Sequence, residues 1–325
     1  MSETSLKFWS VSLALVIAVA ALPTSATESA EPPRFEVPAP DPGGTVTFVV
    51  YGDTRFTRRD GVANAPARRA LVDKIAGENP AAILIGGDLV YEGDSPDDYE
   101  TYRSETQQWA SRKIPVFPAL GNHEFRDCGD DVNPCLENWW DTFTALRPYR
   151  WYSVTIGGTL RAVILDSDAR LRTGSEQRAW FEQQIRAADA DPQIKFILIM
   201  LHYPPVRDPF YPSMLDEKEV ARYLAKKAHS LRAQVVVVGS HVHNYERYSR
   251  NGVTYLVSGG GGAKPVPAVR LFGELSKLHT AVNYHYIRFS LGNDRLTGTM
   301  VRFDAAERTG AAWSEPDHFE VKARN

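Results

Sequence analysis

The chain has 325 residues, a formal net charge of -3, and apolar (43%) and charged (24%) fractions that are ordinary for a soluble globular protein. Its length allows one large α/β domain or two small ones. The small net charge and the lack of a dense lysine and arginine block argue against a nucleic acid as a stable partner. Anionic small molecules are not excluded, because a local metal site can supply positive charge.

The chain opens with a segment that has the layout of an export signal. Lys7 precedes the apolar run 8–22, and the small residues Thr24 and Ala26 follow at a plausible cleavage site. The alternative is a single membrane anchor, for which the apolar run is short. We therefore expect residues 1–26 to be a signal peptide, so that the mature protein is secreted or periplasmic and carries no membrane segment.

Residues 27–44 form a spacer in which five prolines fall between Glu31 and Gly44. A segment of this composition is expected to be extended and unpacked. No internal repeat and no second linker follow, so we expect one catalytic domain over residues 45–304. Residues 305–325 are expected to form a loosely packed C-terminal tail.

Within this domain, apolar runs rich in β-branched residues alternate with helical patterns. They predict strands at 46–51, 82–86, 116–119, 161–165, 195–201, 234–238 and 253–257, and helices at 65–77, 97–112, 175–188 and 216–231. Continuous apolar strands between helices indicate a sheet covered on both faces. Residues 284–291 and 295–302 alternate in hydrophobicity around a turn and predict an antiparallel hairpin. Together these patterns predict an α/β fold, a sandwich of two sheets flanked by helices.

The two cysteines, Cys128 and Cys135, lie close together in a polar stretch. In an oxidising compartment this spacing predicts a disulfide that closes a small loop. Two free thiols are the alternative, and export argues against them. A metal site at the cysteines is not expected, because no further Cys or His nearby completes a tetrahedral ligand set.

Five of the predicted strands end in residues that can bind metal ions. These residues are Asp53, Asp88, Asn122 followed by His123, His202, and His241 together with His243. Ligands bind at the carboxyl edge of the strands in α/β sheets, so we expect these side chains to meet. One such residue alone is more often a turn residue, a helix cap or a structural side chain. Five compatible strand ends together indicate a metal site.

The donor types indicate the chemistry of this site. Carboxylates, imidazoles and an amide oxygen suit Zn, Fe or Mn rather than a metal bound by thiolates. A carboxylate can bridge two ions roughly 3.5–4 Å apart, and such a pair activates a bridging water and holds both ends of an in-line displacement. Phosphate-ester hydrolysis uses this chemistry.

The motifs around these residues resemble those of the calcineurin-like metallophosphoesterases, and among them those of the purple acid phosphatases. The motifs are Gly52-Asp53, Gly87-Asp88-Leu89-Val90-Tyr91, Gly121-Asn122-His123-Glu124, His202 after an apolar strand, and Ser240-His241-Val242-His243-Asn244-Tyr245-Glu246-Arg247. They follow the family's order and span most of the predicted domain. The resemblance implies the two-sheet metallophosphoesterase architecture.

Two positions favour the purple acid phosphatases. Arg55 stands where many members of the family have a histidine ligand, and Tyr91 stands where purple acid phosphatases supply a phenolate; a buried, hydrogen-bonded tyrosine is the alternative. The resemblance implies a ferric first ion and a second ion that is Fe, Zn or Mn. The implied ligands are Asp53, Asp88, Tyr91 and His243 for the first ion, and Asp88, Asn122, His202 and His241 for the second, with Asp88 as the bridge.

The resemblance also implies roles toward the substrate. His123 is expected to contact phosphate and to protonate the leaving group; the alternative is that it only orients Asn122. Arg55 is expected either to bind a phosphate oxygen through its planar guanidinium or to form a surface salt bridge. Ser240 departs from the glycine that is usual in the family. Residues 203–215 lack the substrate-facing histidine of plant members, so their substrate preference does not transfer.

The function implied by these residues is that of an exported acid phosphatase. It would hydrolyse small-molecule phosphate monoesters through a metal-bridging hydroxide, with catalysis assigned to Asp88 and His123. A phosphodiesterase on the same metal core is the second possibility, and a non-catalytic surface binding protein is the third. The sequence carries no signal for an oligomeric state.

Overall fold

The structure is a computed structural model that describes residues 31–41, 43–129, 133–208, 216–267, 284–305 and 313–324. The predicted signal peptide lies outside the described residues. The helices and strands described below all belong to one unit of the chain, Pro32–Asn325. None of the helices in the described ranges has the length and apolar character that crossing a membrane requires.

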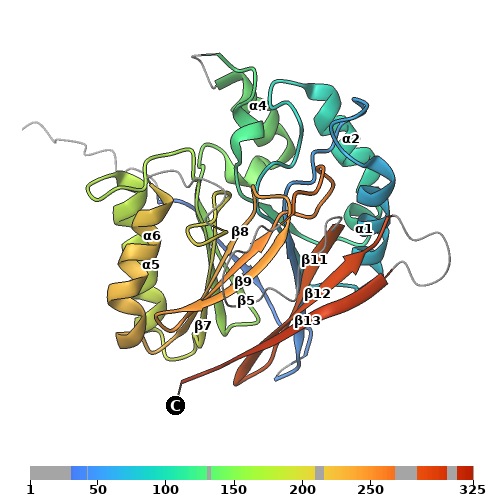
Figure 1. Cartoon of the computed structure of the whole chain (residues 1–325). Coiled ribbons are helices and arrows are strands. Elements are labelled where there is room, and N and C mark those ends of the chain that lie inside the picture. Colours follow the sequence, from blue (N-terminus) through green and yellow to red (C-terminus); the bar gives the residue numbers. More distant parts are fainter. Residues whose placement is uncertain are drawn as a thin grey trace, which may run out of the picture. The chain divides into compact units, whose positions relative to one another are not determined.

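Two β-sheets form the centre of the fold (Figure 1). The strands of the first sheet are β1 (Arg34–Val37), β5 (Tyr152–Ile156), β6 (Leu160–Ile164), β7 (Phe196–Met200), β8 (Gln234–Gly239), β9 (Tyr245–Arg250) and β10 (Val253–Ser258). Those of the second are β2 (Val46–Tyr51), β3 (Ala82–Ile85), β4 (Val116–Pro118), β11 (Tyr284–Leu291), β12 (Arg295–Phe303) and β13 (Trp313–Lys322). The strand orders are β1-β5-β6-β7-β8-β10-β9 and β13-β12-β11-β2-β3-β4.

Helices cover the outer faces of both sheets. They are α1 (Ala65–Gly77), α2 (Pro96–Glu105), α3 (Gln107–Ser111), α4 (Asn133–Thr142), α5 (Glu176–Ala190) and α6 (Glu217–Lys227). In Figure 1, α5 and α6 lie beside the first sheet and α1 lies beside the second. Three of these helices begin at a capping side chain: Asn64, Ser95 and Ser175 each accept a backbone N–H from the first turn. These caps satisfy donors that would otherwise have no partner in the helix.

Successive residues of the central strands face opposite sides of their sheet. In β6, Ala162 and Ile164 pack into the core that contains both sheets, whereas Val163 packs into a cluster with residues of α5 and α6. Both faces of this strand are therefore buried, which explains why its sequence is apolar throughout.

The predicted two-sheet sandwich flanked by helices is confirmed. Strands β2 and β11 and helix α1 have the predicted bounds. The predicted helix 97–112 is divided at Thr106 into α2 and α3, and α6 ends at Lys227 with a 3-10 turn, Ala228–Ser230, after it. Strands β5 and β9 and helix α4 were not predicted.

Two segments that we expected to be unpacked belong to the sheets, so both expectations were wrong. Arg34–Val37 forms β1, which pairs in parallel with β5. Trp313–Lys322 forms β13, which pairs with β12. Both strands lie at sheet edges, where backbone pairing on one side suffices and flanking prolines are tolerated. The folded domain therefore extends beyond residues 45–304 at both ends.

Candidate metal centre

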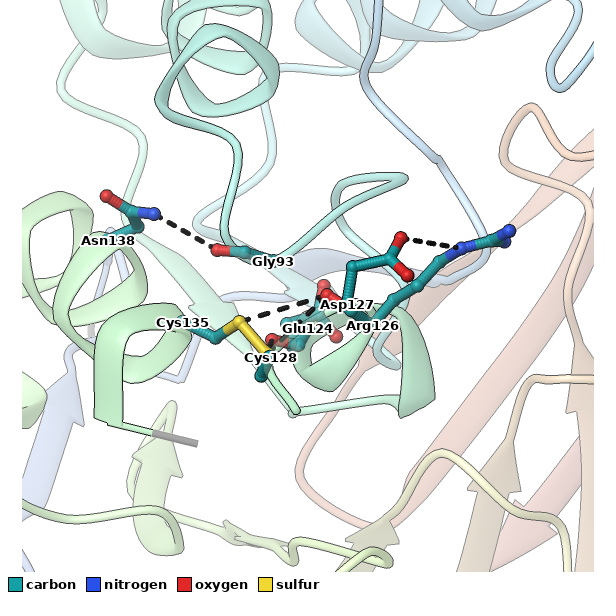
Figure 2. The surroundings of a disulfide bond; sticks show 7 residues. All are labelled: Gly93, Glu124, Arg126, Asp127, Cys128, Cys135 and Asn138. Carbon is teal, nitrogen blue, oxygen red and sulfur yellow. Dashed lines mark hydrogen bonds and ion pairs between the residues drawn. A yellow bond between two sulfur atoms is a disulfide. The ribbon is translucent and has the colours of Figure 1, made fainter. Parts of the chain in front are cut away.

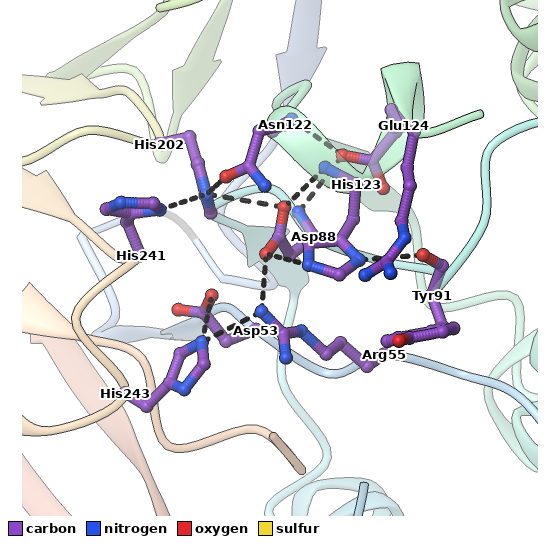
Figure 3. Close-up of polar contacts among 12 residues, drawn as sticks. Asp53, Arg55, Asp88, Tyr91, Asn122, His123, Glu124, His202, His241 and His243 are labelled. Carbon is purple, nitrogen blue, oxygen red and sulfur yellow. Dashed lines mark hydrogen bonds and ion pairs between the residues drawn. The ribbon is translucent and has the colours of Figure 1, made fainter. Parts of the chain in front are cut away.

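Strands from both sheets end at one place, as Figure 3 shows. In the second sheet, the adjacent parallel strands β2, β3 and β4 precede Asp53, Asp88 and Asn122. In the first sheet, the adjacent parallel strands β7 and β8 precede His202 and the pair His241 and His243. Each sheet thus supplies three of the seven predicted ligands, oxygen donors from one and imidazoles from the other.

One group of ligand atoms gathers around the Nε2 atom of His202. That atom lies 3.1 Å from Oδ1 of Asn122, 3.3 Å from Oδ1 of Asp88 and 3.2 Å from Nδ1 of His241. The other ring nitrogen, Nδ1, donates to the carbonyl oxygen of Gly86 at 2.9 Å, because a carbonyl can only accept. In a neutral His202 the Nε2 lone pair would therefore face two oxygen acceptors. Such an arrangement requires a cation, either a proton or a metal ion.

The second group lies around Asp53. Nε2 of His243 is 3.4 Å from Oδ1 of Asp53, and Nδ1 of His243 donates to the carbonyl oxygen of Lys264 at 3.0 Å. Both Asp53 oxygens are buried, and neither has a hydrogen-bond partner in the described part of the chain. A buried carboxylate without a partner is costly, and a bound cation removes that cost. Asp53, Asp88 and His202 form a group that can hold a metal ion, with ligand atoms within 4.8 Å of one another.

The pKa shifts of two of the predicted ligands, Asp88 and His241, favour metal binding. Burial raises the pKa of Asp88, but the charges of His202, His123 and Arg55 outweigh it and leave the pKa below its usual value. Burial and then the neighbouring His202 lower the pKa of His241 to about 4. Asp88 is therefore ionised and His241 neutral over most of the physiological range, which is the state that metal ligation requires.

The family comparison agrees with this geometry. The model of the calcineurin-like phosphoesterase family matches residues 46–245. The chain belongs to the calcineurin-like phosphoesterases.

Individual relatives of this phosphoesterase are distant. A probable purple acid phosphatase of Arabidopsis thaliana is 23% identical over 278 residues, which cover 76% of this chain and 60% of the relative. The structure of a purple acid phosphatase from yellow lupin seeds has a TM-score of 0.66 at 18% identity and covers 89% of this chain and 55% of the lupin chain. GAP50, the anchor in the inner membrane complex of Plasmodium, has a TM-score of 0.60 at 16% identity. That match covers 86% of this chain and 90% of the GAP50 chain. The chain spans 45–60% of the length of the curated relatives it matches.

Four of the eight non-glycine residues with positive φ in the described part of the chain lie at the candidate metal centre. Asp53, Arg55, Asp88 and His241 all have left-handed backbone conformations, with φ of 57°, 46°, 52° and 65°. Non-glycine residues rarely adopt this region, and strained residues cluster at functional sites because the surrounding fold holds them there.

Close approach of the backbone explains the glycine run after β10 and the departure at Ser240. A Cβ on Gly259 would stand 2.5 Å from Oδ2 of Asp53, so only glycine fits beside that carboxylate. Ser240 is accommodated because Gly86 leaves room for its side chain, whose hydroxyl donates to the carbonyl oxygen of Ser258 at 3.1 Å.

Sequence reasoning gave no role to Glu124, which holds two of the ligand loops together. Its carboxylate is fully buried and accepts the backbone N–H groups of Gly121, Asp88 and Leu89 at 2.6, 3.0 and 2.7 Å. It thereby joins the loop after β3 to the loop after β4. Burial and then the Asp88 charge raise the pKa of Glu124, while the backbone donors oppose that shift. Glu124 is the last residue of the family motif Gly121-Asn122-His123-Glu124, and this position was the signal in the sequence that could have indicated its role.

No hydrogen bond or ring contact joins Tyr91 to the other six predicted ligands within the described residues. Its hydroxyl makes no hydrogen bond with any described residue. The Tyr91 ring instead contacts the His123 ring, with centroids 5.1 Å apart, and lies under the guanidinium of Arg126 at 4.4 Å. A second arginine, Arg59, lies 5.2 Å from the same ring. Figure 3 shows this ring on the far side of Arg55 from His243.

The predicted disulfide between Cys128 and Cys135 is confirmed. Figure 2 shows that it joins the segment after Phe125 to helix α4, with Cα atoms 6.1 Å apart. Asn138 of α4 donates to the carbonyl oxygen of Gly93 at 3.1 Å, two residues beyond Tyr91. The disulfide therefore restrains the loop that carries Arg126, the residue stacked on Tyr91.

Proposed function

We propose that this phosphoesterase is an exported acid phosphatase that hydrolyses phosphate monoesters with two metal ions. The observation that carries the proposal is the pair of buried groups described above. The Asp53 oxygens accept no hydrogen bond from the described residues, and two oxygen acceptors converge on His202, so both groups favour a bound cation. Export is supported by the N-terminal signal-like segment and by the disulfide.

We assign the first ion to Asp53, Asp88 and His243, and the second to Asp88, Asn122, His202 and His241. Two bound ions would supply positive charge toward the phosphate and would acidify a water molecule between them. Asp88 fits the bridging role because its two oxygens face different neighbours, Oδ1 toward His202 at 3.3 Å and Oδ2 toward Arg55 at 3.4 Å.

His123 is suited to protonate the leaving group. Its Nδ1 donates to the carbonyl oxygen of Tyr91 at 2.7 Å, which leaves Nε2 to carry the transferable proton, 3.8 Å from Oδ2 of Asp88. Burial, followed by the charges of Arg55 and Arg126, lowers the pKa of His123, although Asp88 raises it. The ring therefore carries its proton only in acidic solution, which supports an acid phosphatase.

The identity of the ions is part of the proposal. A ferric first ion and an Fe, Zn or Mn second ion follow from the resemblance to purple acid phosphatases. Tyr91 would supply the phenolate to the first ion, beside Asp53 and Asp88. The donor set of carboxylates, imidazoles and an amide suits all three metals.

A substrate panel separates the proposed function from its alternatives. The protein is reconstituted with each metal and given p-nitrophenyl phosphate and bis-p-nitrophenyl phosphate. Faster kcat/KM on the monoester, lost in Asp88→Asn, supports the proposal. Preference for the diester would instead make the protein a phosphodiesterase. Failure on both would favour a binding protein, a role that its distant structural relative GAP50 illustrates as an anchor.

A further inference from the structure

We propose that Arg55 is a resident cation at the first metal position, so that the two positions load in sequence and the first one last. The inference rests on the ligand assignment in the proposed function. It goes beyond that function because it assigns Arg55 a role toward the metal ion rather than toward the substrate.

The decisive contact is between Arg55 and His243. Nη2 of Arg55 lies 3.1 Å from Nε2 of His243. The Nδ1 atom of His243 donates to the carbonyl oxygen of Lys264, so Nε2 holds the ring's lone pair and accepts from the guanidinium. An imidazole nitrogen has one lone pair. His243 can therefore accept from Arg55 or bind an ion, but it cannot do both.

The same guanidinium nitrogen contacts the bridging carboxylate. Nη2 of Arg55 lies 3.4 Å from Oδ2 of Asp88, while Oδ1 of Asp88 faces His202 at 3.3 Å. Arg55 thus contacts one atom from each of two ligands assigned to the first ion. Figure 3 shows its side chain reaching between Asp88 and His243. In the described residues, this guanidinium makes no hydrogen bond or ion pair with Asn122, His202 or His241, the ligands that belong to the second position alone; it reaches that position only through Asp88, the shared ligand.

The backbone of Arg55 is fixed beside the site. Its N–H donates to the carbonyl oxygen of Asp88 at 3.0 Å, and its own carbonyl oxygen accepts Nη1 of Arg68 at 2.9 Å. Arg68 is itself buried and paired with Glu105 at 2.8 Å. This support holds Arg55 in its left-handed conformation, with φ of 46°. The chain therefore keeps a permanent positive charge next to the first position.

The arm of Arg55 is held less firmly than its backbone. Its Nε atom is buried without a hydrogen-bond partner among the described residues, and the side chain is 16% exposed. Among the described residues, hydrogen bonds and ion pairs to the guanidinium come through Nη2 alone, so an incoming ion can displace it. Displacement removes the competition for His243, but the repulsion between two cations remains as long as the backbone is fixed. Both effects lower the affinity of the first position for its ion and leave the affinity of the second position almost unchanged.

Calorimetric titration of the metal-stripped full chain with Zn²⁺ tests this inference. In the wild type we expect a tight ion followed by a weaker one. Arg55→Met keeps an unbranched side chain as far as the position of Nε and removes the charge and the donors beyond it. We expect this variant to raise the Zn²⁺ affinity of the weaker step by about ten-fold or more. The affinity of the tight step should stay within about two-fold of the wild-type value. Arg55→Gln is a second variant of the same kind, should the methionine disturb packing.

Arg126→Met is the matched control. It removes a cation that stacks on Tyr91 near His123 but touches none of the ligand atoms. It should leave both steps within about two-fold of the wild type. Two further variants locate the steps: His243→Ala should abolish the weaker step, and Asn122→Ala should weaken the tighter one. Circular dichroism of each variant shows whether it is folded.

Three results would overturn the inference. They are equal affinities for both ions in the wild type, an unchanged weaker step in Arg55→Met, and an equal gain in Arg126→Met. The readout is metal affinity, so the outcome is independent of turnover. If the protein hydrolyses phosphate esters but binds both ions with equal affinity, only the role proposed for Arg55 is contradicted. If the protein binds the two ions in sequence but hydrolyses no phosphate ester, only the proposed function is contradicted.

Discussion

The Glu124 carboxylate accepts the backbone N–H of Asp88 at 3.0 Å, so a buried acidic residue holds the backbone of the carboxylate that we propose as the bridge. We expect Glu124→Ala to lower the free energy of unfolding by about 3–5 kcal/mol, because several buried N–H groups lose their partner. Glu124→Gln should fold but bind Zn²⁺ more weakly, since one amide oxygen replaces two carboxylate oxygens. Chemical denaturation and metal titration measure the two effects. Unchanged metal affinity in a folded Glu124→Gln would remove this positioning role. Glu100→Gln, on the exposed face of α2, is the control.

Asp317 of β13 ties the last strand of the second sheet to β9 of the first. It accepts the Tyr245 hydroxyl at 2.6 Å and two N–H groups of Arg247 at 2.7 and 2.9 Å. We expect Asp317→Ala to cost about 2–4 kcal/mol of unfolding free energy, because a mostly buried pair loses one member. Glu315→Ala, which breaks a more exposed pair with Arg288, should cost less than about 1 kcal/mol. Equal losses in thermal or urea unfolding would contradict this account of the C-terminal strand.

His123 is expected to act mainly on substrates with poor leaving groups. His123→Ala should lose about 10²–10⁴-fold in kcat on alkyl phosphates and less on nitrophenyl phosphate, which needs little help from an acid. Parallel kinetics on the two substrates provide the measurement. The same loss on both would mean that His123 only positions its neighbours.

The pH profile tests the environment of His123. Because burial and the nearby arginines lower its pKa, the ring loses its proton at a lower pH than an ordinary histidine does. Hydrolysis of alkyl phosphates should therefore fall as the pH rises through this lowered value. Arg126→Met removes one of the positive neighbours, so the pKa of His123 rises and the alkaline limb moves to higher pH. A limb that stays in place, or moves down, would show that another group controls it.

Tyr91 tests the relation to purple acid phosphatases. A phenolate on a ferric ion gives a strong visible absorption band, so iron-loaded wild-type protein should be pink to purple. Tyr91→Phe should abolish the band while the protein stays folded, because only the hydroxyl is lost. Visible absorption and circular dichroism on matched samples measure both. Full turnover by a colourless enzyme that holds zinc or manganese and no iron would contradict the ferric assignment and leave the two-metal proposal intact.

The sequence predicted the positions of the metal-binding strand ends because that information is local. An apolar run followed by Asp53 or Asp88 identifies both a strand and its end, and parallel strands bring their ends together. The edge strands β1 and β13 escaped prediction because backbone pairing with distant strands holds them. Their alternation of polar and apolar residues is short, and it lies next to Pro32 and Pro33 in one strand and around Pro316 in the other. The role of Glu124 was hidden for a similar reason, since the N–H groups that it accepts come mostly from a loop more than thirty residues away.

Side-chain direction was the hardest feature to predict. The motif places Tyr91 three residues after Asp88, which is compatible with ligation, but it does not reveal that Arg59 and Arg126 lie against the ring. Both come from other segments of the chain. The sequence showed that Arg55 replaces the histidine of many family members. It could not show the contact of Arg55 with His243, because that residue lies 188 positions further along the chain.

Metal content and turnover, measured on one preparation, test the central claim most directly. We predict that a chelator removes both the bound ions and the hydrolysis of p-nitrophenyl phosphate, and that adding metal restores both in proportion. Asp88→Asn, which loses the carboxylate that we propose as the bridge, should bind fewer ions and should stay inactive at every metal concentration. Hydrolysis that survives complete removal of metal, or a fully loaded wild type with no hydrolysis of any phosphate ester, would contradict the account.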